Sequence, residues 1–138
     1  MAFTRHKGKT KTMWLPVTTS TTFTKGDIVS WSSGLLIKAT SSTTALSHAG
    51  VIKKTIAATD SDYATARLVP VEVPVEKNVV WLADFTSGLL TTDIGAEVDL
   101  TDAATVNRAA STVDACIIVG YISTTKGYVT INFYAGKA

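Results

Sequence analysis

The chain has 138 residues, of which 46% are hydrophobic and 17% charged, and its formal net charge is +2. This length and composition are typical of one folded domain and exclude a mostly disordered protein. The charge is unevenly distributed, because residues 1–12 hold four of the thirteen Lys and Arg residues and no Asp or Glu. A basic N-terminal arm followed by a slightly acidic body is therefore expected.

The arm and its Thr-rich connector are expected to cover residues 1–24. In an extended chain, alternate side chains point to the same side with a repeat of about 6.6 Å, and the basic residues of the arm occupy every second position. These residues are Arg5, Lys7, Lys9 and Lys11. Little apolar side-chain area accompanies them before Met13, so the arm is not expected to fold by itself.

Three interpretations of the arm remain open. It is a solubilising tail, a salt-dependent contact to nucleic-acid phosphates, or a segment that lies on another protein and anchors there with aromatic side chains. A protein partner is favoured, because the body is net acidic and the three tryptophans lie in different predicted segments. The predicted partner-binding residues are Phe3, Arg5, Lys7, Lys9, Lys11, Trp14 and Pro16.

Residues 25–138 are expected to form a single all-β domain, a small barrel or sandwich built of hairpins. β-Branched residues are frequent there, and apolar positions recur at intervals of two or in short blocks. The stretch "GDIVSWSSGLLIKA" predicts strands near 27–31 and 35–39 that are joined by a tight turn. "HAGVIKKTI" predicts another strand, and "DSDY" predicts a loop.

The stretch "LVPVEVPV", residues 68–75, alternates strictly and places four valines on one face and two prolines on the other. Proline removes a ladder donor, so this strand is predicted to lie at a sheet edge or to cross between sheets. "NVVWLADF" and "GAEVDLT" predict two further strands, and short helical turns are expected only within 86–94 and 101–105. "CIIVGYISTTKGYVTINFY" predicts a final hairpin.

The sequence also contains an internal similarity at an offset of 69 to 70 residues. "GDIVSW", "KATSST" and "HAGVI" correspond to "GAEVDL", "RAAST" and "IVGYI". Either a duplication or chance similarity in a β protein rich in Ser, Thr and Ala explains the pattern. A duplication implies two similar hairpin units packed into one barrel or sandwich.

No pattern predicts catalysis, so we expect a protein that is not an enzyme and uses no cofactor or metal. The His and Cys residues are too far apart for a zinc site, and no phosphate-binding loop or nucleophile turn occurs. Asp60 with Asp62, and Asp99 with Asp102, flank small polar residues and are predicted to stabilise turns.

The single cysteine, Cys116, lies among apolar residues and is predicted to be a buried, inert thiol. His48 is predicted to form a local hydrogen bond. The longest apolar runs are strand-sized, so no membrane span is expected, and the protein is expected to be soluble and made in a reducing cytoplasm.

The order of these motifs resembles the small β-barrel head decoration, or capsid cement, proteins of tailed bacteriophages. The resemblance covers most of residues 25–134, through "KGDIVSW", "GLLIKATSST", "HAGVIKKTI" and the closing "IIVGYISTTKGYVTINF". It implies a structural virion protein that binds the outer surface of the phage head, often as a homotrimer, and ties neighbouring major capsid protein subunits together. The arm is then expected to lie on a neighbouring subunit, and the virion is the expected location after synthesis in the host cytoplasm.

Two further functions are weighed against this expectation. The first is a virion-surface glycan-binding or host-adhesion module, for which Tyr63, Trp81 or Tyr121 would form a stacking site. The second, less favoured, is a nucleic-acid-binding protein that uses the basic arm.

Overall fold

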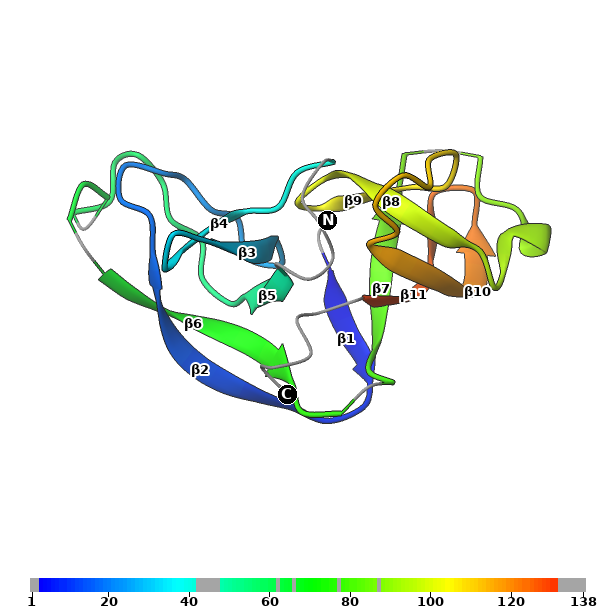
Figure 1. Ribbon diagram of the computed structural model, residues 1–138, viewed down its shortest axis with the longest axis horizontal. Helices are drawn as coiled ribbons and strands as arrows, with labels where there is room; N and C mark the ends of the chain where they lie inside the picture. The colour runs from blue at the N-terminus through cyan, green and yellow to red at the C-terminus, as the bar shows by residue number, and fades with distance from the viewer. Residues whose placement is uncertain are drawn as a thin grey trace.

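The computed structural model describes residues 3–41, 48–61, 63–65, 67–76, 78–86 and 88–131. Almost all of its regular structure is β, which confirms the all-β class expected from the sequence. The strands form two small barrels that lie side by side along the longest axis of the molecule (Figure 1). The described part of residues 25–138 therefore contributes to two barrels rather than to the single one expected.

Repeat 1 is the barrel formed by residues 10–74, and it closes in the order β2-β4-β3-β5-β6. Its strands are β2 (Thr10–Val17), β3 (Ile28–Ser32), β4 (Leu35–Lys38), β5 (His48–Ile52) and β6 (Arg67–Pro74). Alternate side chains of these strands fill the barrel interior, where Phe23 and Ile56 from the connecting segments join them. The inward positions of β6 are Val69, Val71 and Val73, as the alternation predicts.

Repeat 2 is the barrel formed by residues 80–131. Its strands are β7 (Val80–Phe85), β8 (Glu97–Asp102), β9 (Thr105–Asn107), β10 (Cys116–Ser123) and β11 (Lys126–Ile131). They pair in the order β7-β11-β10-β8-β9, and β9 pairs again with β7 to close the barrel. The 3-10 helix η2 (Thr91–Asp93) lies within the segment 86–94, where a helical turn was expected, whereas 101–105 contains the turn of the β8–β9 hairpin.

The two barrels have the same topology. In each, the first strand pairs in parallel with the third and antiparallel with the fifth, and the second strand joins the third and fourth. Even irregular details recur: Gly26 N–H donates to Ile52 O (2.8 Å) in repeat 1, and Gly95 N–H donates to Ile118 O (2.7 Å) in repeat 2. The internal similarity in the sequence therefore corresponds to two structurally equivalent units.

The N-terminal segment is part of both barrels. The strand β1 (Thr4–Lys7) pairs antiparallel with β7 of repeat 2, and β2 pairs with β6 of repeat 1 over its whole length. The expected boundary after residue 24 consequently does not separate an arm from a body. Strand pairing supplies the backbone hydrogen bonds that the basic segment cannot obtain from a core of its own.

The three prolines of the chain all lie in the β2–β6 pair, and the prediction that 68–75 lies at a sheet edge or crosses between sheets is wrong. β6 pairs with β2 on one side and with β5 on the other. The carbonyl of Pro70 accepts Lys53 N–H (2.9 Å), so the backbone of Pro70 points toward β5 and away from β2. Pro70 faces Trp14 in the register, and Pro16 and Pro74 occupy positions of the same parity. At these positions an N–H group would point away from the partner strand. The prolines therefore cost no hydrogen bond between β2 and β6.

The two repeats are packed against each other through the β8–β9 turn. Ile28 N–H of repeat 1 donates to Ala103 O of that turn (2.8 Å), and Ala103 is buried. Ile28, Ala39 and Val51 of repeat 1 belong to the same buried cluster as the core of repeat 2. Apolar burial between the barrels therefore holds them in a fixed relation.

Candidate partner-binding surface

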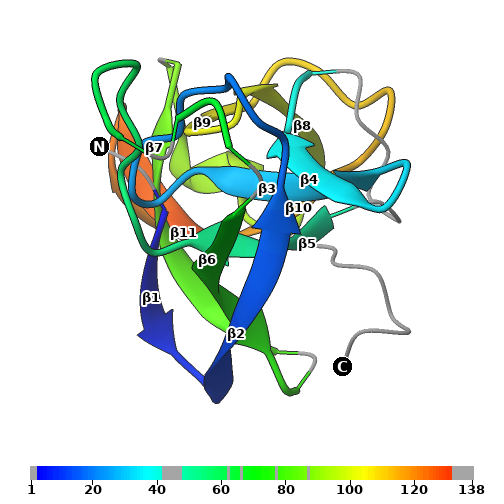
Figure 2. The ribbon, with the colours of Figure 1, turned by 90° about the vertical axis from the view of Figure 1, so that its left-hand side faces the viewer.

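The outer surface of β2 and β6 is apolar and exposed. Trp14 is 63% exposed and Leu68 is 59% exposed, although both are large hydrophobic side chains in paired strands. Trp14 lies opposite Pro70, and Pro16 lies opposite Leu68, so the four side chains share one face of the sheet. We call Trp14, Pro16, Leu68 and Pro70 the Trp14 face. Figure 2, in which repeat 1 is toward the viewer, shows the two strands that form it.

Cations border the Trp14 face. Lys53 extends from the end of β5 and donates to Thr12 Oγ1 (3.0 Å). Lys7, Lys9 and Lys11 are exposed along β1, β2 and their connection. Arg5 pairs with Glu72 Oε2 at 2.8 Å, so this cation is held in place beside the face. An apolar centre with a polar rim is a common layout of protein-binding surfaces, and here the rim includes Lys53 and Arg5.

The structure places the seven predicted partner-binding residues in four different environments. Trp14 and Pro16 lie together on the Trp14 face, whereas the three lysines are exposed along the N-terminal segment, and Lys11, opposite buried Val73, has the parity of the other face of β2. Arg5 is engaged by Glu72. Phe3 is only 3% exposed, packs in the cluster between the repeats and donates its N–H to Gly26 O, so its predicted role as an exposed anchor is wrong.

Leu68 and Pro70 were not predicted as site residues. The strict alternation of "LVPVEVPV" contained the signal, because the residues between the buried valines had to face outward. Their pairing with Trp14 and Pro16 depends on the register between β2 and β6, which are separated by about fifty residues and which no local pattern connects.

The equivalent face of repeat 2 is occupied by other groups of the same chain. Thr18 and Thr86 are equivalent, since each donates its N–H at 3.0 Å to the carbonyl of a third-strand residue, Leu36 or Val106. Four residues earlier, Trp14 corresponds to Leu82, which lies opposite Tyr128. The positions equivalent to the rest of the face are Asp84 and Lys126, which form an ion pair of 2.7 Å.

Strand β1 covers part of this second face. It pairs with β7 at Val80, Trp81 and Leu82, and the ring of His6 lies 4.3 Å from that of Tyr128 between centroids. Repeat 2 thus has a covered and charge-paired face, whereas the matching face of repeat 1 is exposed and apolar.

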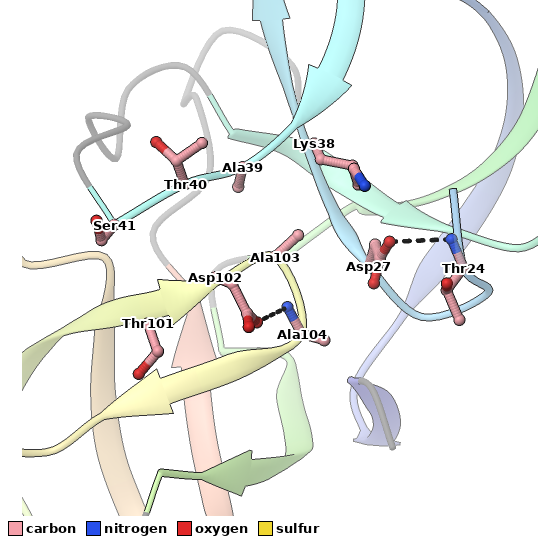
Figure 3. Close-up of a pocket in the computed structure, with 10 residues that line it drawn as sticks. All are labelled: Thr24, Asp27, Lys38, Ala39, Thr40, Ser41, Thr101, Asp102, Ala103 and Ala104. Carbon is pink, nitrogen blue, oxygen red and sulfur yellow. Dashed lines mark hydrogen bonds between the residues drawn. The ribbon is translucent and has the colours of Figure 1, made fainter. Parts of the chain in front are cut away.

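A second candidate site is the cleft between the repeats, with a volume of about 540 Å³. Its lining, drawn in Figure 3, is Thr24, Asp27, Lys38, Ala39, Thr40, Ser41, Thr101, Asp102, Ala103 and Ala104. Both carboxylates accept backbone hydrogen bonds, Asp27 from Thr24 (3.0 Å) and Asp102 from Ala104 (2.9 Å). Burial raises the pKa of Asp27, partly offset by the Thr24 bond and by Lys38, whose side chain extends toward Asp27 in Figure 3. These contacts stabilise turns at the junction of the repeats.

The remaining buried polar residues also have structural partners. Ser30 Oγ lies 2.8 Å from His48 Nδ1, and burial lowers the pKa of His48 to about 4, so the imidazole is neutral at pH 7. His48 is hydrogen-bonded as predicted, but its partner lies 18 residues away on β3 and is not local in the sequence. Asp99, which is equivalent to Ser30, accepts N–H bonds from Thr112, Val113 and Asp114 at 2.7–2.9 Å. Asp102 stabilises a turn as predicted, whereas Asp99 lies within β8 rather than in a turn, although it does satisfy backbone N–H groups as expected.

Asp60 accepts Ala57 N–H (2.8 Å) in a turn, as predicted, whereas Asp62 lies outside the described residues. Cys116 is buried as expected, and its burial raises the pKa of the thiol well above the ordinary value. Both residues therefore have local structural explanations.

The aromatic residues considered for glycan stacking do not form one surface. Trp81 is fully buried in repeat 2, so its predicted role as a stacking platform is wrong. Tyr63 packs on the core of repeat 1 and donates its hydroxyl to Ser20 O (2.9 Å). Tyr121 is exposed on β10, in the other repeat.

Within the described residues, no group of three or more His, Cys, Asp or Glu side chains could hold a metal ion. The described part of the chain likewise has no helix that is long and apolar enough to cross a membrane.

Comparisons with known proteins give no family for this chain. A search against protein-family models found no match, and a search of curated protein sequences also found no significant match.

Proposed function

We propose that the protein is a structural capsid decoration protein, without enzymatic activity, that binds the outer surface of a tailed-phage head and ties major capsid protein subunits together. The observation that supports a binding role is the Trp14 face, an exposed apolar centre with a basic rim. The resemblance of the sequence motifs to head decoration proteins supports the choice of partner. Association of copies as a trimer, which the resemblance implies, belongs to the same proposal.

The geometry changes how the N-terminal segment would act. Residues 4–7 and 10–17 are paired within the chain, so the contact with the capsid is made by a folded surface rather than by a free arm. A preorganised surface loses less conformational entropy on binding than a disordered segment does. Several modest contacts of this kind on one shell act together to give firm attachment.

The test is co-sedimentation of the purified protein with empty, expanded heads of the phage that encodes it. The double variant Trp14→Glu, Leu68→Glu places two charges on the Trp14 face, and we expect at least a tenfold loss of affinity, since truncating a central aromatic anchor alone often costs about 2 kcal/mol. A matched control is Ile94→Glu, which alters a side chain that is 50% exposed in repeat 2 and should leave binding unchanged.

Three results would contradict parts of the proposal. Failure of the unaltered protein to bind these heads would reject the decoration function. Binding of the double variant at full strength would reject the Trp14 face. DNA binding that falls steeply with salt, without head binding, would favour the nucleic-acid alternative.

A further inference from the structure

We infer that the free edge of β2 accepts an added strand, an extended acidic segment of a partner protein that lies antiparallel to β2 between Thr10 and Trp14. This inference rests on the proposed function, because it specifies what the same surface of repeat 1 binds. It derives from the difference between two equivalent strands of the two repeats.

Repeat 2 shows the mode of binding within the chain itself. β7 pairs with β9 at Asp84 and Phe85, and the earlier part of the same edge pairs with β1. β1 is only four residues long and runs antiparallel to β7, with Thr4 opposite Leu82. The equivalent of β7 thus accepts a short added strand at a defined position.

The corresponding edge of repeat 1 has no such strand. β2 pairs with β4 at Val17 alone, and the rest of that edge pairs with no strand among the described residues. Thr12 and Trp14 are the equivalents of Val80 and Leu82, the β7 residues that β1 covers. An exposed edge with regular backbone geometry is a template for strand addition.

Backbone N–H groups of β2 at alternate positions point away from β6, toward the position that an added strand would occupy. Thr18 N–H bonds to Leu36 O on the β4 side, and strand parity directs Thr12 and Trp14 the same way. Pro16 has the same parity and lacks a donor, which confines strand addition to the part of β2 that precedes it. The available segment, Thr10–Trp14, is about as long as the segment that β1 covers on β7.

The Trp14 face supplies a site for one side chain of the added strand. In repeat 2, His6 of β1 reaches across β7 to the ring of Tyr128. The position equivalent to Tyr128 is Pro70, which lies beside the exposed ring of Trp14. An added strand would therefore place an apolar or aromatic side chain on Trp14 and Pro70.

The surrounding charge selects an acidic strand. Lys9 and Lys11 are exposed at the start of β2, and Lys53 reaches Thr12 Oγ1 (3.0 Å). Glu72 is bonded to Arg5 and to Thr10 Oγ1, and Glu76 accepts Lys9 N–H, so the nearby carboxylates are already engaged. Attraction between the lysines and an acidic segment increases the rate of encounter and disfavours basic segments.

A second copy of the chain does not fit this description. Among the described strands, β8 contains the most acidic residues, and it is paired on both sides by β9 and β10. The segment is therefore assigned to a different protein, and under the proposed function that protein is the major capsid protein.

The experiment is an NMR titration of the full chain with a synthetic heptapeptide of alternating glutamate and valine. We expect saturable shifts of the backbone amides of Thr12 and Trp14 and of the Trp14 indole. The variant Thr12→Pro removes one outward N–H and, by the parity of Pro16, no bond to β6, so we expect an intact fold and affinity weaker by at least tenfold, about 1.4 kcal/mol. Thr12→Val, which retains the N–H, should bind the peptide normally.

Two control peptides test the preference for acidic side chains and the need for backbone hydrogen bonds. A lysine–valine heptapeptide and a glutamate–valine heptapeptide with methylated amide nitrogens should both bind at least tenfold more weakly. Equal binding of the lysine peptide would overturn the acidic assignment. Equal binding of the methylated peptide, or of Thr12→Pro, would overturn strand addition. Dimerisation that is lost in Thr12→Pro would show that a second copy occupies the edge, which also overturns the inference.

The peptide and head assays fail independently. Protein that binds heads through the Trp14 face but does not bind the acidic peptide would contradict strand addition alone. Protein that binds the peptide at Thr12 and Trp14 but not the heads would contradict the decoration function alone.

Discussion

The two repeats share one topology but differ in their turns and in the surfaces through which they contact each other. The β8–β9 hairpin of repeat 2 contains one residue more than the β3–β4 hairpin of repeat 1, because its register shifts between Leu100 and Asp102. Its turn reaches the other barrel, whereas Ser33 and Gly34 in the β3–β4 turn are exposed. Ala39 is buried against repeat 2, but its equivalent, Ala109, is exposed. The buried core and the strand pairing are therefore common to both repeats, whereas small differences at turns and strand edges determine what each repeat contacts.

Repeat 1 contacts repeat 2 through the surface around Ile28. The corresponding surface of repeat 2 is polar. Ile28, which is buried beneath Ala103, corresponds to Glu97, which is exposed. Arg108 and Asp93 of the same repeat form an ion pair of 2.9 Å, and the hydrogen bond from Arg108 lowers the pKa of Asp93. The matching surfaces of the two repeats therefore differ in polarity, apolar and buried in repeat 1 and polar and exposed in repeat 2.

The largest expected difference between the repeats concerns their equivalent buried polar residues, Asp99 and Ser30. Asp99→Ala leaves three backbone N–H groups without their acceptor and should lower the free energy of unfolding by about 4 kcal/mol. Ser30→Ala removes one hydrogen bond to neutral His48 and should cost about 1 kcal/mol. Urea denaturation of both variants measures the difference, and equal losses would contradict it.

The contact between the repeats can be broken at Ala103. Ala103→Glu forces a carboxylate into the apolar junction near Ile28 and should cost about 3 kcal/mol. Ser32→Glu alters the exposed end of β3 in repeat 1 and should change stability by less than about 0.5 kcal/mol. Thermal unfolding followed by calorimetry compares them, and a stable Ala103→Glu protein would show that the junction tolerates charge.

Substitutions at two glycines with positive φ distinguish the cost of backbone strain from the cost of steric crowding. At Gly8, φ is +104° and a Cβ atom would lie 2.8 Å from Val79 Cα, whereas at Gly34, φ is +83° and no atom lies within 4 Å. Gly8→Ala should therefore cost about 3 kcal/mol and Gly34→Ala about 1 kcal/mol, from backbone strain alone. Similar losses in chemical denaturation would mean that the backbone at Val79 moves readily.

Acidification should act on repeat 1 through His48. Its pKa is lowered from 6.5 to about 4 by burial, so the unfolded chain binds more protons than the folded protein between these values. Stability attributable to His48 is present above pH 6.5 and is lost as the pH falls toward 4, by about 3 kcal/mol. His48→Gln should lack this part of the pH dependence, and identical profiles of unfolding free energy against pH would refute the assignment.

The smallest expected effect concerns Asp27, whose equivalent in repeat 2 is Ala96. Burial raises the pKa of Asp27, so ionisation in the folded state costs stability as the pH rises above 3.8. Asp27→Asn stays neutral and can still accept the Thr24 bond, so it should be more stable at pH 7 by less than about 1 kcal/mol. The gain should vanish below pH 3.8 in urea titrations, and a gain that persisted there would have another cause.

Local patterns in the sequence were sufficient for the strands that bury one face. The alternation of Val69, Val71 and Val73 and the glycines before β3 and β8 predicted strands and a repeated unit, because side-chain direction follows from the position in the chain alone. The repeat offset was less accurate near "HAGVI", where Val51 pairs with Ile28 as Ile117 pairs with Glu97, a shift of 66 residues. Loop lengths between equivalent strands differ, which a single offset cannot describe.

Long-range pairing could not be predicted from the sequence. Arg5 lies opposite Trp81, and nothing near either residue specifies that partner. The lysine spacing indicated an extended conformation correctly, but the same spacing fits a free arm and a paired strand equally well. Likewise, Pro70 is tolerated between two neighbours only because of its parity in the register with β2, which is a tertiary property.

Within the described residues, the chain crosses between the barrels at two links that lie side by side. The link from β1 to β2 and the link from β6 to β7 are bonded to each other, since Val75 N–H donates to Lys9 O and Lys9 N–H donates to Glu76 Oε1, both at 3.1 Å. Tension that pulled the barrels apart would have to break these bonds and shear β1 from β7 together, rather than extend one slack connection. The two bonded links should therefore hold the barrels together under force, so that the molecule transmits load between two attachment points without lengthening.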